Sequence, residues 1–246
     1  EGEIAICQKN NQSFMFKVSA ETDFAVRSER FQENMKMFQE KLSKELFTFT
    51  FNYSGEVAAL EDCNAFCALE GATLKENITF DIEFLNAFQD EKIFSYLHSN
   101  KKIGVLVKLR ISPNMDANQT IDPIDDISPQ SFFDSTLNEL GNNIAMQIAS
   151  MNPIVINIGQ LPEDLVNRQK NICEEQYAAS QKSGRVVAVV SETIIKGKMK
   201  KWHSEVALLE QECIWKSKCN IQKAISDVEK ELNCKIEVVE FIKMEI

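Results

Sequence analysis

The 246-residue sequence predicts an α+β fold: two subdomains, each with a small antiparallel sheet packed by helices, plus an inserted antiparallel helical hairpin, or coiled coil. Two observations lead to this prediction. A hairpin of strands followed by a helix occurs twice, and two polar helical stretches of similar length meet at a glycine turn. We therefore expect residues 1–89 to form the core N-subdomain, residues 90–157 and 207–246 the core C-subdomain, and residues 158–206 the helical hairpin.

The first module shows a change of hydrophobic period along the chain. Residues 3–8 and 14–18 alternate at period two on either side of an Asn-Asn turn, which predicts a β-hairpin. Residues 28–45 have helical spacing with apolar side chains on one stripe, and residues 56–69 form a second predicted helix. Alternation returns over residues 79–88. The module is therefore expected to run strand, strand, helix, helix, strand.

A similar pattern follows in the second module. Residues 91–97 and 103–111 form a second predicted antiparallel pair, and the apolar spacing over residues 137–151 predicts a helix. Residues 221–232 form a further short helix. The last stretch, residues 235–246, alternates with one slip in its period, so we expect a closing strand that returns to the second sheet.

The insertion consists of two polar helical arms. Residues 163–181 and 187–202 flank a turn that contains Gly184, and this arrangement predicts an antiparallel hairpin. On the first arm apolar residues recur every seven positions, at Leu165, Ile172 and Ala179, with Val166 and Cys173 beside them. Because such a hairpin buries only a narrow seam, we expect it to project from the body of the protein.

Charge and composition limit the classes of partner. Acidic residues outnumber basic ones by 37 to 27, and the formal charge of −10 opposes binding to nucleic-acid phosphates. The chain has no apolar run of the roughly 18 residues that span a bilayer, and no basic, apolar leader at its start. The 7 cysteines are scattered, which favours reduced thiols. We expect a cytoplasmic protein that binds another protein, without direct contact to nucleic acid or membrane.

Motifs for catalysis or cofactor binding do not emerge from the sequence. The 8 glycines form no Walker or Rossmann loop, so we expect no bound nucleotide or other cofactor. Cys63 and Cys67 have the spacing of half a zinc site but lie in an apolar helical stretch, which favours a place in the core. The acidic stretch around Asp122, Asp125 and Asp126 lacks the glycine and closing glutamate of an EF-hand. An enzyme using Cys and His, and an RNA contact through the lysines of residues 196–201, remain alternatives.

Five short stretches occur in a fixed order along nearly the whole chain. They are Ala20-Glu21-Thr22-Asp23-Phe24-Ala25-Val26-Arg27; Glu76-Asn77-Ile78; Tyr96-Leu97-His98 with Ile103-Gly104-Val105-Leu106-Val107; Ile144-Ala145-Met146-Gln147-Ile148-Ala149; and Gly197-Lys198-Met199-Lys200-Lys201-Trp202 running through Glu205-Val206 and Leu209 to Gln211. Together they resemble the elongation factor Ts family. The resemblance implies two α+β subdomains with a helical-hairpin insertion, which is the architecture that the periodicity also predicts.

The resemblance further implies an activity, guanine-nucleotide exchange on the GTPase elongation factor Tu. A member of this family binds the GTPase with its GDP and promotes GDP release, without catalytic residues of its own. The family's Asp-Phe pair, which contacts the GTPase beside its magnesium and phosphate region, maps to Asp23 and Phe24, next to Thr22. Further family contacts map to Leu74, Lys75, His98 and Ile214.

Two departures from the family pattern shape the expectations. The family commonly carries a three-helix domain before the first hairpin, and many members continue past the last strand, so we expect part of the docking surface to be missing and binding to be weaker. After Gly184 the run Val186, Val187, Val189 and Val190 is apolar and β-branched, which predicts a covering partner or self-association through this arm. A non-exchanging adaptor that binds a GTPase or another protein through the same surface is the alternative function.

Overall fold

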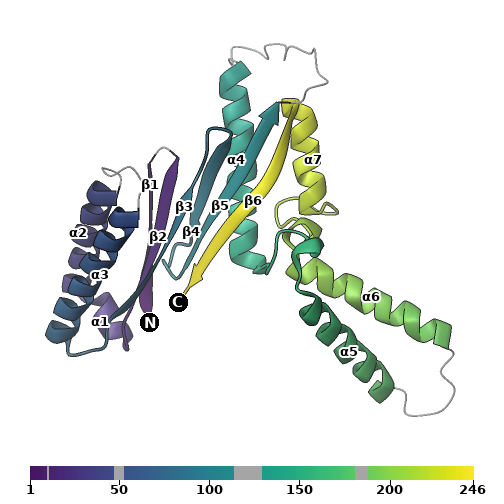
Figure 1. Ribbon diagram of the computed structural model, residues 1–246, viewed down its shortest axis with the longest axis horizontal. Helices are drawn as coiled ribbons and strands as arrows, with labels where there is room; N and C mark the ends of the chain where they lie inside the picture. Colours follow the sequence, from purple (N-terminus) through teal and green to yellow (C-terminus); the bar gives the residue numbers. More distant parts are fainter. Residues whose placement is uncertain (10, 47–52, 114–128, 181–187) are drawn as a thin grey trace. The chain divides into compact units, whose positions relative to one another are not determined.

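Two compact units make up the chain. The computed structural model describes residues 1–9, 11–46, 53–113, 129–180 and 188–246 (Figure 1). The first unit contains residues 1–149 and 234–246, and the second contains residues 150–233. The predicted subdomain boundaries, at residues 89, 158 and 206, stay predictions.

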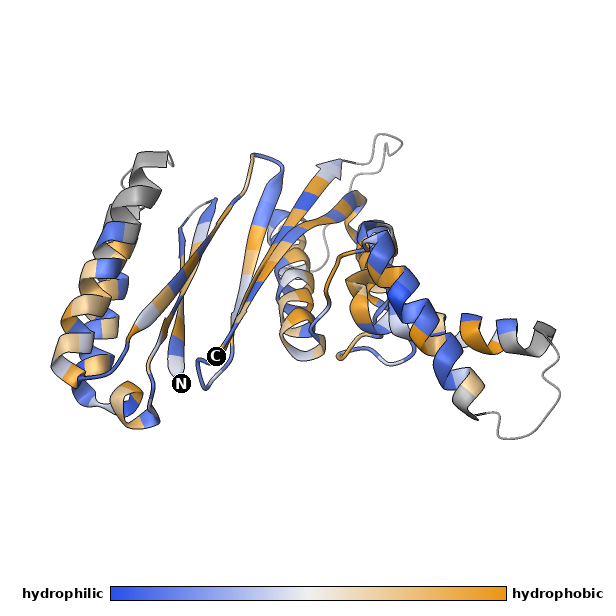
Figure 2. Ribbon diagram, turned by 60° about the horizontal axis from the view of Figure 1, so that its bottom comes forward, coloured by the Kyte–Doolittle hydropathy of each residue, from blue (hydrophilic) through white to orange (hydrophobic). Residues whose placement is uncertain are grey.

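The first unit begins with a three-stranded antiparallel sheet in the order β1-β2-β3. Its strands are β1 Gly2–Lys9, β2 Gln12–Ser19 and β3 Thr79–Asn86. Ile6 pairs with Met15 across the first ladder, and Phe16 pairs with Ile82 across the second. The strands lie close to the predicted ranges. β3 alternates apolar and polar residues, whereas the middle of β1 and of β2 is continuously apolar, and Figure 2 colours the ribbon by this hydropathy.

Three helices cover one face of this sheet: α1 Asp23–Arg27, α2 Glu29–Leu46 and α3 Tyr53–Leu74 (Figure 1). Phe16 of β2 meets Phe38 of α2 edge to face at 5.7 Å, and Phe38 stacks on Phe66 of α3 at 4.4 Å between ring centroids. Such aromatic pairs add to the free energy of burial. The core of this module therefore lies between the sheet and its helices.

The helices differ from the prediction in two respects. α3 is longer than the predicted range 56–69. It ends at Leu74, and Lys75 follows in the left-handed conformation with φ of 57°. The sequence analysis missed α1, because five residues are too few to show a helical period.

The first unit holds a second antiparallel sheet in the order β4-β5-β6. Its strands are β4 Glu91–Leu97, β5 Ile103–Pro113 and β6 Cys234–Glu245. The expected return of the last strand is confirmed, because β6 pairs with β5. Lys108 pairs with Glu240 and Leu109 with Val238, so the register shifts between them. This β-bulge explains the slip in the alternation of the closing strand.

The two sheets pack face to face through Ile4, Met15 and Leu85 of the first and Ile93, Leu106 and Met244 of the second. At Gly104 a Cβ atom would lie only 2.5 Å from the sulfur of Met15, so the close approach requires glycine. On the opposite face of the second sheet, Gly141 of α4 (Pro129–Met151) lies directly against the ring of Phe94. Every strand is therefore packed into a core.

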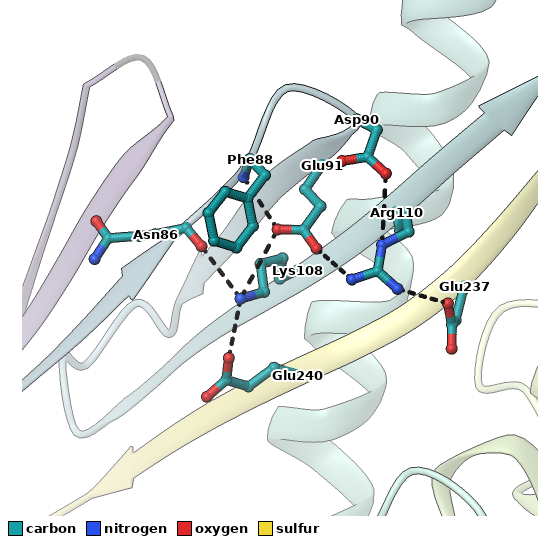
Figure 3. A network of polar contacts seen from close by, with 8 residues as sticks. All are labelled: Asn86, Phe88, Asp90, Glu91, Lys108, Arg110, Glu237 and Glu240. Atoms are coloured by element: carbon teal, nitrogen blue, oxygen red, sulfur yellow. Dashed lines mark hydrogen bonds and ion pairs between the residues drawn. The ribbon is translucent and has the colours of Figure 1, made fainter.

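A buried carboxylate organises one end of the second sheet (Figure 3). Glu91 accepts hydrogen bonds from the Phe88 amide at 3.0 Å and from Arg110 Nη2 at 2.7 Å, while Lys108 Nζ lies 4.0 Å away. Burial alone would raise the pKa of Glu91, but these hydrogen bonds and the two cationic neighbours bring it below its ordinary value. The network joins all three strands, because Arg110 also pairs with Glu237 at 3.1 Å.

The second unit is helical. It contains the 3-10 helix η1 (Ile158–Gln160), α5 (Glu163–Ser180), α6 (Ala188–Val206), the 3-10 helix η2 (Leu208–Glu210) and α7 (Ile221–Leu232). α5 and α6 run side by side in opposite directions, as the hairpin prediction requires (Figure 1). The seam agrees with the prediction in part: Cys173 is buried, together with Tyr177, whereas Ile172 is 44% exposed.

Several expectations concern residues outside the described part of the chain. These are the Lys182-Ser183-Gly184 turn, Val186 and Val187, and the acidic residues Asp122, Asp125 and Asp126. Self-association through the valine run therefore stays a prediction. Among the described helices, none combines the length and the apolar character needed to cross a membrane.

Candidate functional site

The short helix α1 holds its position through its ends and one buried face. The Thr22 hydroxyl accepts a hydrogen bond from the Ala25 amide at 3.4 Å and so caps the helix, and the Ser28 hydroxyl donates to the Ala25 carbonyl at 2.8 Å. Ala25 and Val26 are buried in the core of the first sheet. The remaining face of α1 therefore points away from the core.

Phe24 lies on that outward face. Its side chain is 83% exposed, the largest exposed fraction of any large hydrophobic residue in the described part of the chain. A lone exposed phenylalanine is unremarkable on a flexible loop, but here the backbone beneath it is fixed by a cap and a buried face. The geometry thus presents an aromatic side chain to solvent on a fixed base.

Asp23 lies beside Phe24 and carries the negative charge of the tip. Its carboxylate pairs with Arg27 at 3.5 Å, one helical turn away, and Arg27 is exposed. Exposed ion pairs of this kind contribute little free energy because water screens them. Asp23 can therefore exchange Arg27 for another partner at small cost.

A carboxylate from a distant segment holds the start of α1. Glu76 Oε2 accepts a hydrogen bond from the Thr22 amide at 3.1 Å, and Glu76 Oε1 accepts one from the Thr22 hydroxyl. This contact brings the predicted contact residues Leu74 and Lys75 to the tip. Lys75 is exposed, whereas Leu74 is half-buried against the core. Sequence reasoning missed the role of Glu76, although Glu76-Asn77-Ile78 is one of the matched stretches.

The turn between β4 and β5 also borders α1. A recess of about 260 Å³ is lined by Asp23 and Arg27 of the tip and by Asn100 and Lys102 of this turn. The predicted contact His98 begins the turn, and its carbonyl accepts a hydrogen bond from the Lys101 amide at 2.8 Å. The turn is therefore a near neighbour of the tip.

The ring of His98 and the base of the turn are both held by side chains. The Tyr96 hydroxyl and His98 Nδ1 are hydrogen-bonded at 2.9 Å, which orients the imidazole. Below the turn, the Glu3 carboxylate accepts hydrogen bonds from Lys101 Nζ at 2.5 Å and from Gln32 Nε2 at 2.6 Å. Glu3 thus ties the turn to α2, the helix that follows the tip.

Ile214 lies in the second unit, in the loop between η2 and α7, and is 49% exposed. The other six predicted site residues all belong to the first unit. The structure therefore brings Leu74 and Lys75 close to Thr22, Asp23 and Phe24. It places His98 at the start of the turn that borders the tip, and Ile214 in the other unit.

The side chains of the tip are of kinds suited to binding another protein. Within the described ranges, no three His, Cys, Asp or Glu side chains gather as a metal site. Cys63 and Cys67 are buried in the core of the first sheet, in agreement with their predicted place. What the tip offers is one aromatic ring, one loosely paired carboxylate and flanking polar groups, the composition of a protein-contact hot spot.

Comparison with known proteins decides the family. The family model described as "Elongation factor TS" matches residues 21–246, which include the whole tip from Glu21 onward. The chain belongs to the elongation factor Ts family. The resemblance seen in the five sequence stretches is therefore confirmed.

Three relatives illustrate the likeness, each named "Elongation factor Ts". That of Borreliella burgdorferi (strain ZS7) is 30% identical over 243 residues, which cover 98% of this chain and 77% of the relative. That of Sinorhizobium fredii is 26% identical over 249 residues, covering 97% and 72%. That of Orientia tsutsugamushi is 27% identical over 247 residues, covering 98% and 72%. Membership places the chain among translation elongation factors of the nucleotide-exchange type.

Proposed function

We propose that the chain binds elongation factor Tu in its GDP-bound form and promotes GDP release, so that GTP can bind. The observation that carries the proposal is Phe24, which is 83% exposed on a helix whose opposite face is buried. Burial of an aromatic ring in a partner yields more free energy per residue than most other contacts. Phe24 and Asp23 are therefore the working end of the surface.

The tip would act by weakening the site that holds the nucleotide. GDP stays on a GTPase because magnesium and the amides of the phosphate loop neutralise its charge. Insertion of the Phe24 ring into an apolar slot beside that loop displaces the groups that orient the metal. Asp23 leaves Arg27, from which it lies 3.5 Å, and accepts a hydrogen bond from the GTPase.

The free energy that drives nucleotide exchange comes from binding of the chain to the GTPase. If the chain binds the nucleotide-free GTPase more tightly than the GDP-bound form, it lowers the affinity for GDP by that same factor. GTP, present in excess, then enters the empty site. This scheme requires no general acid, base or nucleophile from the chain.

Preorganisation makes the wedge effective. A flexible loop would lose conformational entropy on binding, at a cost of about 1 kcal/mol for each immobilised side chain. Here the bonds from Thr22 to Glu76 and the burial of Val26 fix α1 before any partner arrives. A larger part of the binding free energy of Phe24 can therefore act to displace the groups that hold the metal.

The remaining contacts extend the surface around the wedge. Leu74 and Lys75 lie next to the tip through Glu76, and His98 begins the neighbouring turn. Ile214 would supply a contact from the second unit. These residues contribute affinity and register, whereas Phe24 and Asp23 act on the nucleotide site.

The test is the release of fluorescent GDP from elongation factor Tu in the presence of excess unlabelled nucleotide. The proposal predicts that the release rate rises with the concentration of the chain and then saturates. Binding of the chain to the GTPase, measured in parallel by calorimetry, separates the two functions. Binding without acceleration would establish the adaptor alternative, and absence of binding would contradict both.

A further inference from the structure

Two cysteines face each other in the second unit, on either side of the five-residue loop 214–218. Cys213 follows η2, and Cys219 directly precedes Asn220, whose side chain caps α7 by accepting from the Lys223 amide at 2.9 Å. Both cysteines are free thiols and both are buried. The loop between them carries Ile214.

Backbone hydrogen bonds set the two cysteines in register. Glu212 and Asn220 form an antiparallel bridge, and the Cys213 amide donates to the Cys219 carbonyl at 2.8 Å. Opposite residues at such a position have Cα atoms about 5.5 Å apart, inside the range of about 4.4–6.8 Å found in disulfides. Cys219 is also close enough to Cys213 to raise the pKa of the Cys213 thiol. The backbone register thus places the two cysteines at a Cα separation that suits a disulfide.

The frame around the pair is fixed on both sides. Next to Cys213, the buried Gln211 donates through Nε2 to the Glu205 carbonyl at 2.9 Å. Within the loop, Lys216 pairs with Asp227 of α7 at 2.8 Å. Because these contacts hold the ends of the loop together, a closing bond costs little extra chain entropy in the folded state.

We propose that Cys213 and Cys219 are a disulfide-forming site, which a small-molecule disulfide such as oxidised glutathione converts from dithiol to intramolecular disulfide. One cysteine thiolate attacks the glutathione disulfide, forming a mixed disulfide and releasing one glutathione. The second cysteine thiolate attacks the protein sulfur of that mixed disulfide and releases the second glutathione. The chain loses two electrons and two protons, and the two glutathione molecules gain them.

The environment of the pair slows its oxidation. Burial, together with the neighbouring Cys219, raises the pKa of Cys213 to about 12. The thiolate is the attacking species, so the reaction of Cys213 is slow at neutral pH unless the loop opens or an oxidoreductase assists. The pair therefore stays reduced during a brief exposure to oxidant and forms the disulfide only when oxidising conditions persist.

Oxidation would close the loop 214–218 covalently and prevent its opening. Since Ile214 lies on this loop, the disulfide fixes the second-unit contact, a consequence that rests on the proposed function. Formation of the bond itself does not depend on any GTPase. The chemical test can therefore fail or succeed independently of nucleotide exchange.

The experiment equilibrates the folded, full chain with mixtures of reduced and oxidised glutathione and a catalytic amount of a disulfide oxidoreductase, which removes the kinetic barrier. After acid quenching and alkylation, trypsin is applied without reduction. Cleavage after Lys201, Lys216, Lys218 and Lys223 places the two cysteines on separate peptides, 202–216 and 219–223. We expect these peptides to be recovered as one linked species lacking two hydrogen atoms.

Matched controls sharpen the result. Cys219→Ser should instead carry glutathione on Cys213 as a mixed disulfide, whereas Cys173→Ser, a change at a buried cysteine elsewhere in the second unit, should leave the link intact. The chain unfolded in guanidinium should need at least tenfold more oxidised glutathione to form the same link. Recovery of unlinked peptides at equilibrium, or a link from Cys213 to any other cysteine, would overturn the proposal.

Discussion

The Glu76 carboxylate accepts hydrogen bonds from both the backbone amide and the side-chain hydroxyl of Thr22, a residue 54 positions earlier in the chain. The contact joins the end of α3 to the start of α1 and sets the direction in which Phe24 points. In the proposed exchange mechanism, Glu76 is thus a positioning residue that need not touch the GTPase.

Replacement of Glu76 should therefore weaken exchange more than it weakens the fold. We expect Glu76→Ala to lower the chain's kcat/KM for GDP release by roughly tenfold, while the free energy of unfolding falls by only about 1 kcal/mol. Glu76→Gln, which keeps one acceptor for the Thr22 hydroxyl, should lose less. Glu21→Ala, at an exposed neighbour of Thr22, is the control. An unchanged release rate for Glu76→Ala would show that the clamp has no part in exchange.

Tyr96 should act on exchange through His98. Its hydroxyl bonds to Nδ1 of the imidazole at 2.9 Å, so Tyr96→Phe frees the ring to rotate while preserving the aromatic packing. We expect a rise of about threefold in the dissociation constant for the GTPase, consistent with the loss of one hydrogen bond. His98→Ala should cost at least as much, and combining the two changes should add nothing further. Additive effects in this double-mutant cycle would contradict the proposed coupling.

A substitution at Gly104 tests how closely the two sheets approach each other. Gly104→Ala places a methyl group against Met15 and Ile4, so we expect a loss of about 1–3 kcal/mol in the free energy of unfolding. Gly197→Ala is the matched change, because a Cβ at Gly197 of α6 has no atom within 4 Å. It should stabilise its helix by up to about 1 kcal/mol. Chemical denaturation followed by circular dichroism measures both, and a neutral Gly104→Ala would refute the close packing.

Glu91 should make stability depend on pH in a defined window. Its pKa is lowered in the folded chain, so its contribution is complete above the unfolded value near 4.5 and disappears as the pH falls through the folded value. At pH 7 we expect Glu91→Gln to cost about 2 kcal/mol. Glu237→Gln, which removes an exposed partner of the same Arg110, should cost less than about 1 kcal/mol.

The measurement for Glu91 is urea denaturation of the wild type and Glu91→Gln at a series of pH values. The gap between their free energies of unfolding should narrow as the pH drops below about 4.5. A gap that stays constant from pH 7 to pH 3 would show that the charge of Glu91 contributes nothing to the network.

Strong periodicity made much of the fold predictable. The alternation around Phe16 and the stripe through Phe38 have clear periods because each strand or helix buries one face against the other. The slip before Phe241 likewise recorded a real bulge opposite Leu109. Such local patterns depend only on which side of a strand or helix is buried, so they are visible in a single sequence.

Other features depend on contacts that no local pattern reveals. α1 is too short to show a period, and its place depends on Glu76, a residue far along the chain. On α5, Ile172 is 44% exposed while its neighbour Cys173 is buried, because the side of a helix that is buried depends on its tertiary contacts. The sequence likewise does not reveal that Cys213 lies opposite Cys219, because this depends on the antiparallel bridge between Glu212 and Asn220.

The most direct test of the central claim is the rate of fluorescent GDP release from elongation factor Tu with Phe24→Ala, beside the matched variant Phe88→Ala. Both residues are strongly exposed phenylalanines of the first unit, at 83% and 72%, and neither should alter the fold when replaced. We predict that Phe24→Ala lowers the acceleration at least tenfold, a loss of about 1.4 kcal/mol or more, while Phe88→Ala exchanges like the wild type. Equal acceleration by Phe24→Ala and the wild-type chain would contradict the account.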